Sequence, residues 1–196
     1  PKLHRTLQRT EVKLVGRLSN DEIVERLKSE SRVLCVVNSR RHAADLLQLL
    51  DDSECLHLSA GMCARHRGKV LKSIRRRLKQ GMPCRVISTQ VIEAGVDVDF
   101  PVVLRAAAGL DSIAQSAGRC NREGKLHDAN GHDRLGQVVV FDYDAKTYPT
   151  SRLIEIGAAH FREIAPDHAD DPLSPEAIEA YFTLHYWHLG GEDDRG

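Results

Sequence analysis

The chain has 196 residues, 41% hydrophobic and 29% charged, with 28 basic and 28 acidic side chains, which are the proportions of an ordinary soluble globular domain. No apolar run approaches the roughly 20 residues that a membrane span needs, and residues 1–5 do not open a signal peptide, so a membrane partner is excluded. Five cysteines without any C-x-x-C spacing argue against a disulfide framework. We therefore expect a cytoplasmic protein. The missing initiator methionine favours a segment of a longer chain.

The charge is unevenly distributed along the sequence. No acidic residue lies between Glu54 and Glu93, whereas nine basic residues fall in that window, and the segment after Arg152 is acidic. The window predicts a surface for an anionic partner.

In chain order, short apolar runs alternate with amphipathic segments. Strands are expected at residues 12–15, 32–37, 55–58, 84–88, 101–104 and 137–141. Helices are expected from the capping box at 19–22 to about 29, at 40–50 and at 65–80, and a further helix is expected after a cap at Asp111, with Gly124 past its end. This alternation predicts an α/β fold with a mainly parallel sheet and helices on both faces. Two further amphipathic helices, 151–164 and 174–188, have no strand between them, so we place a boundary near residues 145–150.

Hydroxyl side chains follow three of the expected strands. Ser39, Ser59 and Thr89 each come just after a strand, at the sheet edge where ligands collect in α/β proteins. Each could be only a helix cap or a turn residue. Three such loops beside the basic window favour a track for a nucleic-acid backbone. The basic helix that begins with Arg65 and Arg67 could contact nucleic acid or present a solvated face, and the low aromatic content predicts phosphate-led, salt-sensitive binding.

A second pattern reads Q-x-x-G-R-x-x-R from Gln115 through Gly118 and Arg119 to Arg122. On a helix, offsets of four and three residues place Gln115 and both arginines on one face. Guanidinium groups match phosphate oxygens in bidentate geometry, which suits a polyphosphate. The alternative is an exposed helix with solvated arginines.

These motifs resemble those of a known family. The stretch from Ser88 to Asp97, S-T-x-x-x-E-x-G-x-D, is similar to motif V of superfamily 2 helicases, and Q-x-x-G-R-x-x-R is similar to their motif VI. The amino-acid sequences of residues 89–101, 108–112 and 118–124 narrow the resemblance to the CRISPR-associated helicase-nuclease of type I systems. The resemblance implies a RecA-like three-layer lobe for residues 1–148, followed by a short helical linker or extension at 149–196.

The resemblance also implies roles for individual residues. Arg119 and Arg122 would be arginine fingers for the triphosphate of ATP, and Gln115 would lie near the γ-phosphate and the attacking water. Asp97 would contact the ribose, and Gly95 would allow close backbone approach. The residues that would hold single-stranded DNA are Ser39, Ser59, Thr89, Arg65 and Arg67. Glu93 could couple the two sites or merely pair with a neighbouring arginine.

The sequence contains no G-x-x-x-x-G-K-[ST] phosphate loop, so it supplies half of an ATPase site. ATP and Mg²⁺ would be held mainly by a first lobe elsewhere in the protein, and this chain alone should not hydrolyse ATP. We interpret His127, Asp128, His132 and Asp133 as exposed loop residues rather than a metal site.

The expected function is therefore the second motor lobe of a DNA translocase or helicase in CRISPR interference. Its expected partners are single-stranded DNA, the first lobe, the nuclease domain and an RNA-guided surveillance complex. The alternatives are a lobe of another superfamily 2 helicase or restriction-type motor, and a non-catalytic nucleic-acid or protein interaction module.

Overall fold

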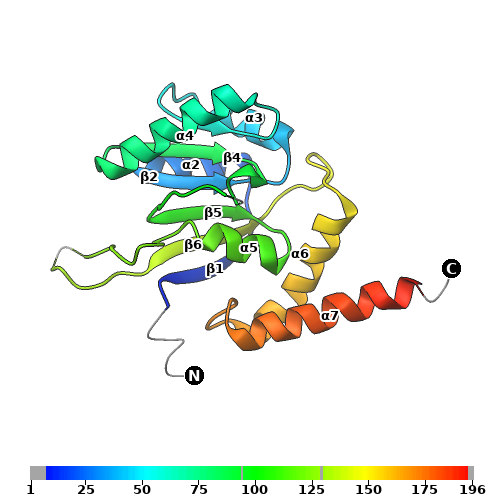
Figure 1. The fold of residues 1–196 in the computed structure, drawn as a ribbon. Helices are drawn as coiled ribbons and strands as arrows, with labels where there is room; N and C mark the ends of the chain where they lie inside the picture. The colour runs from blue at the N-terminus through cyan, green and yellow to red at the C-terminus, as the bar shows by residue number, and fades with distance from the viewer. Residues whose placement is uncertain (1–7, 94, 129, 194–196) are drawn as a thin grey trace.

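Six parallel strands form one sheet at the centre of the molecule (Figure 1). The structure is a computed structural model that describes residues 8–93, 95–128 and 130–193. The strand order across the sheet is β1-β6-β5-β2-β4-β3, and every pairing is parallel. The strands are β1 (Thr10–Arg17), β2 (Arg32–Val36), β3 (Leu56–Leu58), β4 (Cys84–Ser88), β5 (Val102–Ala106) and β6 (Gly136–Asp142).

The helices are α2 (Asn20–Ser29), α3 (Arg40–Leu50), α4 (Ala64–Lys79), α5 (Leu110–Ala117), α6 (Arg152–Ile164) and α7 (Pro175–Asp193), with short 3₁₀ helices η1 (Gln90–Ile92) and η2 (Ala165–His168). Among the described residues, no helix is both long and apolar enough to cross a membrane. The predicted α/β class and the predicted strands are confirmed; β1, β5 and β6 extend beyond their predicted ends, and β2 and β3 are each one residue shorter than predicted.

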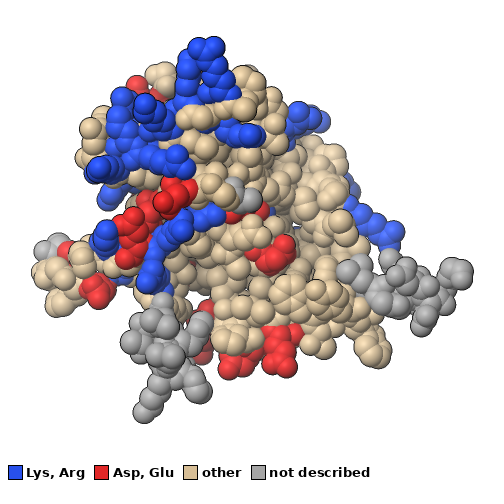
Figure 2. All heavy atoms as spheres, viewed as in Figure 1, with Lys and Arg blue, Asp and Glu red and all other residues tan. Residues whose placement is uncertain are grey.

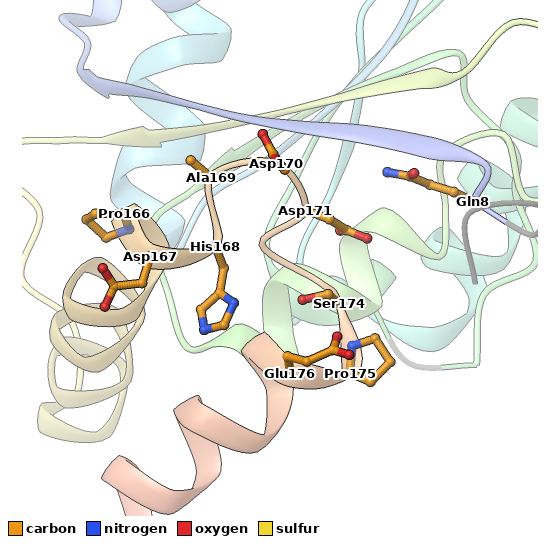
Figure 3. A pocket seen from close by; sticks show the side chains of 10 residues that line it. All are labelled: Gln8, Pro166, Asp167, His168, Ala169, Asp170, Asp171, Ser174, Pro175 and Glu176. Carbon is orange, nitrogen blue, oxygen red and sulfur yellow. The ribbon is translucent and has the colours of Figure 1, made fainter. Parts of the chain in front are cut away.

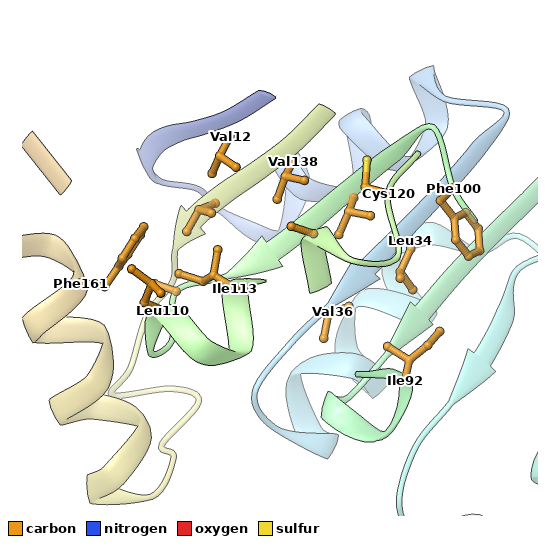
Figure 4. Packing of buried hydrophobic residues seen from close by; sticks show 14 of the residues in the cluster. Val12, Leu34, Val36, Ile92, Phe100, Leu110, Ile113, Cys120, Val138 and Phe161 are labelled. Carbon is orange, nitrogen blue, oxygen red and sulfur yellow. The ribbon is translucent and has the colours of Figure 1, made fainter. Parts of the chain in front are cut away.

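Helices cover both faces of the sheet because the apolar side chains of the strands alternate between two cores. In β2, Leu34 and Val36 join the core beneath α4, α5 and α6, whereas Val33 and Cys35 join the core beneath α2 and α3. Figure 4 shows the first of these cores. The result is the three-layer RecA-like arrangement expected from the resemblance.

The capping box predicted for the first helix is confirmed. The side chain of Ser19 accepts a hydrogen bond from the Glu22 backbone N–H, and the Glu22 carboxylate accepts one from the Ser19 N–H. In α4, Ile74 is buried and Leu71 and Leu78 pack against the core, also as predicted.

The C-terminal helices pack directly against the sheet domain. Phe161 of α6 and Tyr181 of α7 belong to the same core as the strands. A Cβ atom at Gly157 would lie 2.9 Å from the Cα atom of Gly109 and 3.1 Å from the Tyr181 hydroxyl. The helices α6, α7 and the loop before α5 therefore meet where only glycine fits. The boundary expected between residues 148 and 149 stays a prediction.

The helix predicted to carry both arginines is shorter than expected. It ends at Ala117, and Gly118 is its C-cap, so Arg119 and Arg122 lie beyond it. Cys120 and Phe100 form a parallel bridge, and the Cys120 side chain is 1% exposed. The helix ends before Cys120 because the bridge to Phe100 places Cys120 in the core, where it cannot continue α5. The prediction of one helical face shared by Gln115, Arg119 and Arg122 was wrong.

The predicted helix cap at Asp111 was also wrong. The N-cap is Gly109, and Asp111 lies in the first turn of α5.

Candidate functional site

The three predicted hydroxyl residues lie side by side at the carboxyl edge of the sheet. Ser59 follows β3, Thr89 follows β4 and Ser39 follows β2, and these strands are consecutive neighbours. The Thr89 backbone N–H donates to the Leu58 carbonyl at 3.0 Å, which joins two of these loops. The arrangement gives a row of small polar groups along one edge.

The three hydroxyl residues have different surroundings. The Ser39 side chain caps α3, because its oxygen accepts a hydrogen bond from the His42 backbone N–H at 3.1 Å. Ser59 is buried, and its backbone N–H donates to the Met62 sulfur at 3.4 Å. The Thr89 hydroxyl oxygen is shielded from solvent and has no hydrogen-bond partner among the described residues. A buried hydroxyl without a hydrogen-bond partner destabilises the folded chain. A ligand oxygen that accepted a hydrogen bond from this hydroxyl, after the Thr89 side chain had rotated about χ1, would offset that loss.

Arginines flank this row of hydroxyls. A Cβ atom at Gly61 would lie 3.2 Å from Nη1 of Arg40, so the Arg40 guanidinium lies over the loop that follows Ser59. Arg65 is exposed and Arg67 is half-buried, both in the first turn of α4, which begins just after that loop. The sequence interpretation missed Arg40, although its position next to Ser39 was a usable signal.

A buried ion pair lies behind the carboxyl edge. Nε of Arg105 is 2.9 Å from Oε1 of Glu93, and the two side chains are 0% and 6% exposed. Arg105 also donates to the Asn38 side-chain oxygen at 2.7 Å, and the Ser116 hydroxyl donates to Glu93 at 3.0 Å. Of the two roles left open for Glu93, pairing with an arginine is what the structure contains.

Burial dominates the electrostatics of this pair. It raises the pKa of the Glu93 carboxyl above its ordinary value, and the positive charge of Arg105 opposes that shift. Burial likewise lowers the pKa of the Arg105 guanidinium, and the negative charge of Glu93 opposes it. Each charge is therefore tolerated largely because the other is present.

The two motif arginines lie at the opposite, amino edge of the sheet. The Phe100 N–H donates to the Arg119 carbonyl at 2.9 Å, just before β5 begins. The Arg122 N–H donates to the Asp99 carboxylate at 2.8 Å. Arg119 and Arg122 are thus held beside the loop that contains Asp97.

Arg122 and Asp97 form an exposed ion pair. Their side chains are 46% and 81% exposed, and Nη1 of Arg122 lies 2.5 Å from Oδ1 of Asp97. Exposed pairs of this kind contribute at most about 1 kcal/mol, so a ligand with its own anionic groups could replace the carboxylate at little cost.

Arg119 is held differently. Its Nη2 donates to the Glu93 carbonyl at 2.6 Å and its Nε to the Ile92 carbonyl at 3.2 Å. Partial burial lowers the pKa of this guanidinium, with a further contribution from the nearby charge of Arg122. Arg119 is therefore half-buried, whereas Arg122 is exposed.

The two remaining predicted residues lie near these arginines in the chain. Gln115 is exposed on α5, less than one turn before the helix ends. Gly95 has a positive φ of 66°, a conformation that glycine adopts without strain. A Cβ atom there would meet no atom of the described chain within 4 Å, so the site is open to an incoming group.

A hollow of about 680 Å³ contains none of the predicted site residues. It is lined by residues around η2 and the start of α7, including Asp167, Asp170, Asp171 and Glu176 (Figure 3). Its carboxylates disfavour a phosphate ligand, so it is not the candidate site.

The histidines and aspartates of the loop before β6 form two exposed pairs, His127 with Asp133 at 3.1 Å and His132 with Asp128 at 3.3 Å. Within residues 8–93, 95–128 and 130–193, no group of three or more His, Cys, Asp or Glu side chains is arranged to hold a metal ion.

Comparison with known proteins identifies relatives of this chain. A family model described as CRISPR-associated nuclease/helicase Cas3, C-terminal, matches residues 29–125. A CRISPR-associated nuclease/helicase Cas3 of Methanothermobacter thermautotrophicus is 31% identical over 121 residues, which are 61% of this chain and 14% of that protein.

Solved structures share the fold. T. fusca Cas3 with ATP superposes with a TM-score of 0.68 at 16% identity, over 89% of this chain and 23% of that one. A chain from a structure named as a CRISPR RNA-guided surveillance complex, pre-nicking, superposes with a TM-score of 0.56 at 18% identity, over 93% of this chain and 27% of that one. This chain therefore spans about a quarter or less of the length of these relatives.

Proposed function

Because this chain belongs to the Cas3 family of CRISPR-associated nuclease/helicases, as their C-terminal RecA-like helicase lobe, we propose that it is the second motor lobe of an ATP-dependent translocase. It supplies two arginines to the nucleotide and one wall of the track for single-stranded DNA. The first lobe and the nuclease domain belong to other parts of the same protein.

One observation carries this proposal: a single segment, residues 89–99, reaches both edges of the sheet. It begins with Thr89 at the carboxyl edge. The carbonyls of Ile92 and Glu93 hold the Arg119 guanidinium, and Asp97 pairs with Arg122. A shift of this segment caused by DNA would therefore move the groups that hold both arginines, which is what a motor lobe requires.

The residues at the amino edge fit one side of a nucleoside triphosphate. Arg122 would release Asp97 to bind phosphate oxygens, Arg119 would add a second charge, and Asp97 would accept from the ribose hydroxyls. Gln115 would lie near the γ-phosphate and the attacking water. Mg²⁺ would be held by the first lobe, where it would offset the charge of the phosphates.

We further propose that the complete protein acts with an RNA-guided surveillance complex. The support is the likeness to a chain of the solved complex that bears this name. The exposed Arg40 of α3 and Arg65 of α4, beside the hydroxyl row, support DNA as the substrate that is moved.

The proposal is tested by Arg122→Ala in the complete protein. Arg122 is exposed, so its loss should leave folding intact while ATP turnover stimulated by single-stranded DNA falls by about 10³-fold or more. Steady-state phosphate release measures turnover, and thermal unfolding is the control. Turnover within a few-fold of the unchanged protein would sink the assignment of Arg122.

Thr89→Val tests the DNA track. Valine has the shape of threonine and removes a buried hydroxyl without a described partner, so stability should hold or rise by about 1 kcal/mol. Affinity for single-stranded DNA, measured by fluorescence anisotropy, should fall, whereas Arg122→Ala should leave it unchanged. The track assignment fails if Thr89→Val binds DNA as the unchanged protein does.

A further inference from the structure

The outer surface of α4 carries a stripe of five cations. Arg65, Lys69, Lys72, Arg76 and Lys79 follow one another at offsets of four, three, four and three residues, and all five are exposed. This spacing places them on one line along the helix, over about 21 Å. Figure 2 shows the Lys and Arg side chains gathered over this part of the molecule.

None of the five stripe cations forms an ion pair with a described residue, in contrast to neighbouring arginines of the same helix. Arg77 pairs with Glu54 at 2.7 Å, and Arg75 donates to the Asp97 carbonyl at 3.1 Å. Like charges at these offsets repel one another, and cations in the first turn oppose the helix dipole. Arg76 and Lys79 in the last turn favour the dipole, but the mutual repulsion along the stripe would be relieved by an anionic partner outside this chain.

The surface around the stripe favours a nucleic acid over an acidic protein. None of the large apolar side chains that are exposed among the described residues lies on α4, whereas protein interfaces rely on apolar and aromatic anchors. The sequence of α4 also contains no Phe, Tyr or Trp ring for stacking unpaired bases, and His66 is its one aromatic side chain. A partner held only through its phosphates, with its bases already stacked, is a double helix.

We propose that the outer face of α4 binds the phosphate backbone of duplex DNA, separately from the single-stranded track at the carboxyl edge. The helix begins just after the Ser59 loop and runs antiparallel to the strands toward the amino edge, so the duplex lies alongside the lobe and meets the track near Arg65. This inference rests on the proposed function, in which the track holds one strand of DNA, and extends it to the part of the DNA whose two strands are still paired.

The test neutralises four stripe residues in the complete protein: Lys69→Gln, Lys72→Gln, Arg76→Gln and Lys79→Gln. Arg65 is left in place because it is assigned to the track. The matched control neutralises four exposed cations that lie off α4: Lys13→Gln, Arg26→Gln, Lys28→Gln and Lys146→Gln. Both variants change the net charge equally, and α2, which carries two of the control residues, covers the opposite face of the sheet.

The probes are a blunt duplex of about 20 base pairs and an oligothymidine of the same length, followed by fluorescence anisotropy between about 50 and 200 mM salt. The stripe variant should bind the duplex at least about tenfold more weakly, with a salt slope smaller by up to about 0.9 for each DNA phosphate that is no longer neutralised. Its oligothymidine affinity and its DNA-stimulated ATP turnover should match those of the control.

Equal duplex affinity in the stripe variant and the control overturns the inference, as does an equal reduction in both. A stripe variant that binds duplex normally but no longer binds the surveillance complex also overturns it, in favour of a protein partner. Absence of ATP turnover in the unchanged protein would instead contradict the proposed motor function, and the duplex measurement would still decide the role of α4.

Discussion

At the scale of single residues, His42 is a buried base whose pKa is shifted by its surroundings. It is fully buried in α3, its ring stacks on Tyr148 with centroids 4.1 Å apart, and its Nε2 lies 3.1 Å from the Asn20 side-chain oxygen. Burial lowers the pKa of this imidazole to about 4. The neutral ring therefore ties α2 and α3 to the segment that follows β6.

We expect His42 to make the stability of this chain depend on pH. The unfolded imidazole takes up a proton below about pH 6.5, whereas the folded one stays neutral to about pH 4, so stability is complete above 6.5 and is lost as the pH falls through this window. The loss between about pH 7 and pH 5 should be about 2 kcal/mol. Urea unfolding of the unchanged chain and of His42→Gln should show a smaller pH dependence in the variant. His66→Gln, at an exposed position, is the control, and an equal pH dependence in all three would contradict the assignment.

At the scale of elements, the buried Glu93–Arg105 pair joins η1, β5 and α5. Glu93 follows η1, Arg105 lies in β5, and Ser116 of α5 donates to Glu93. The pair thus fixes the distance between the segment that holds Thr89 and the helix that precedes Arg119.

Removal of one partner should be costly. Arg105→Leu leaves the Glu93 carboxylate buried without its cation, and we expect a loss of about 3–5 kcal/mol in the free energy of unfolding. The double variant with Glu93→Leu should lose less than the sum of the single changes, by about 1–3 kcal/mol. Arg162→Leu, which breaks the exposed pair with Asp142, should cost at most about 1 kcal/mol and is the matched control.

Denaturant unfolding of the unchanged chain, the two single variants, the double variant and the Arg162→Leu control measures these differences. Because burial raises the pKa of Glu93, a stranded carboxyl takes up a proton more readily, and Arg105→Leu should be less destabilised at acidic pH than at neutral pH. Strict additivity of the two single changes would contradict a coupled pair.

Local signals in the sequence predicted the elements well and their ends less well. The apolar run at residues 32–37 and the capping box at Ser19 lead directly to β2 and α2, because burial and capping act over a few residues. The end of α5 at Ala117 depends on the bridge between Cys120 and Phe100, which are 20 residues apart in the chain. Periodicity within a helix carries no information about such a bridge.

The candidate site was predictable as a set of residues but not as an arrangement. The pattern Q-x-x-G-R-x-x-R identified Arg119 and Arg122, and the ends of the strands identified Ser39, Ser59 and Thr89. The buried position of Arg105 was missed, because an arginine within an apolar strand gives no sign of its partner when Glu93 lies in a distant loop. The order of the strands was likewise not fixed by any local pattern.

At the scale of the whole molecule, the two halves of the site lie at opposite ends of the strands. A strand of five residues, such as β4 or β5, is about 17 Å long, and it separates the hydroxyl row from the backbone of Arg119, whose side chain reaches back to the Ile92 and Glu93 carbonyls. One surface faces DNA and the other faces the nucleotide in the proposed function. The sequence contains no phosphate loop to complete the second.

We therefore expect the isolated chain to have no ATPase activity, with or without single-stranded DNA. Arginines can stabilise the charge that develops during phosphoryl transfer, but they do not bind Mg²⁺ or position the triphosphate on their own. Phosphate release measures this activity, and circular dichroism checks that the chain is folded. Turnover above a trace would contradict the assignment of half a site to this chain.

The close contact between Gly157 and Gly109 joins α6 to the sheet domain, and α7 extends from there. At this contact two backbones lie too close to admit a methyl group, so α6 is packed tightly against the loop before α5. Helix α7, with 19 residues, is about 28 Å long and is anchored near its start by Tyr181, while Trp187 farther along is 81% exposed. A small rotation of the lobe is therefore amplified into a larger sweep at the far end of α7, and a fluorescence signal from Trp187, the only tryptophan in the sequence, would report it.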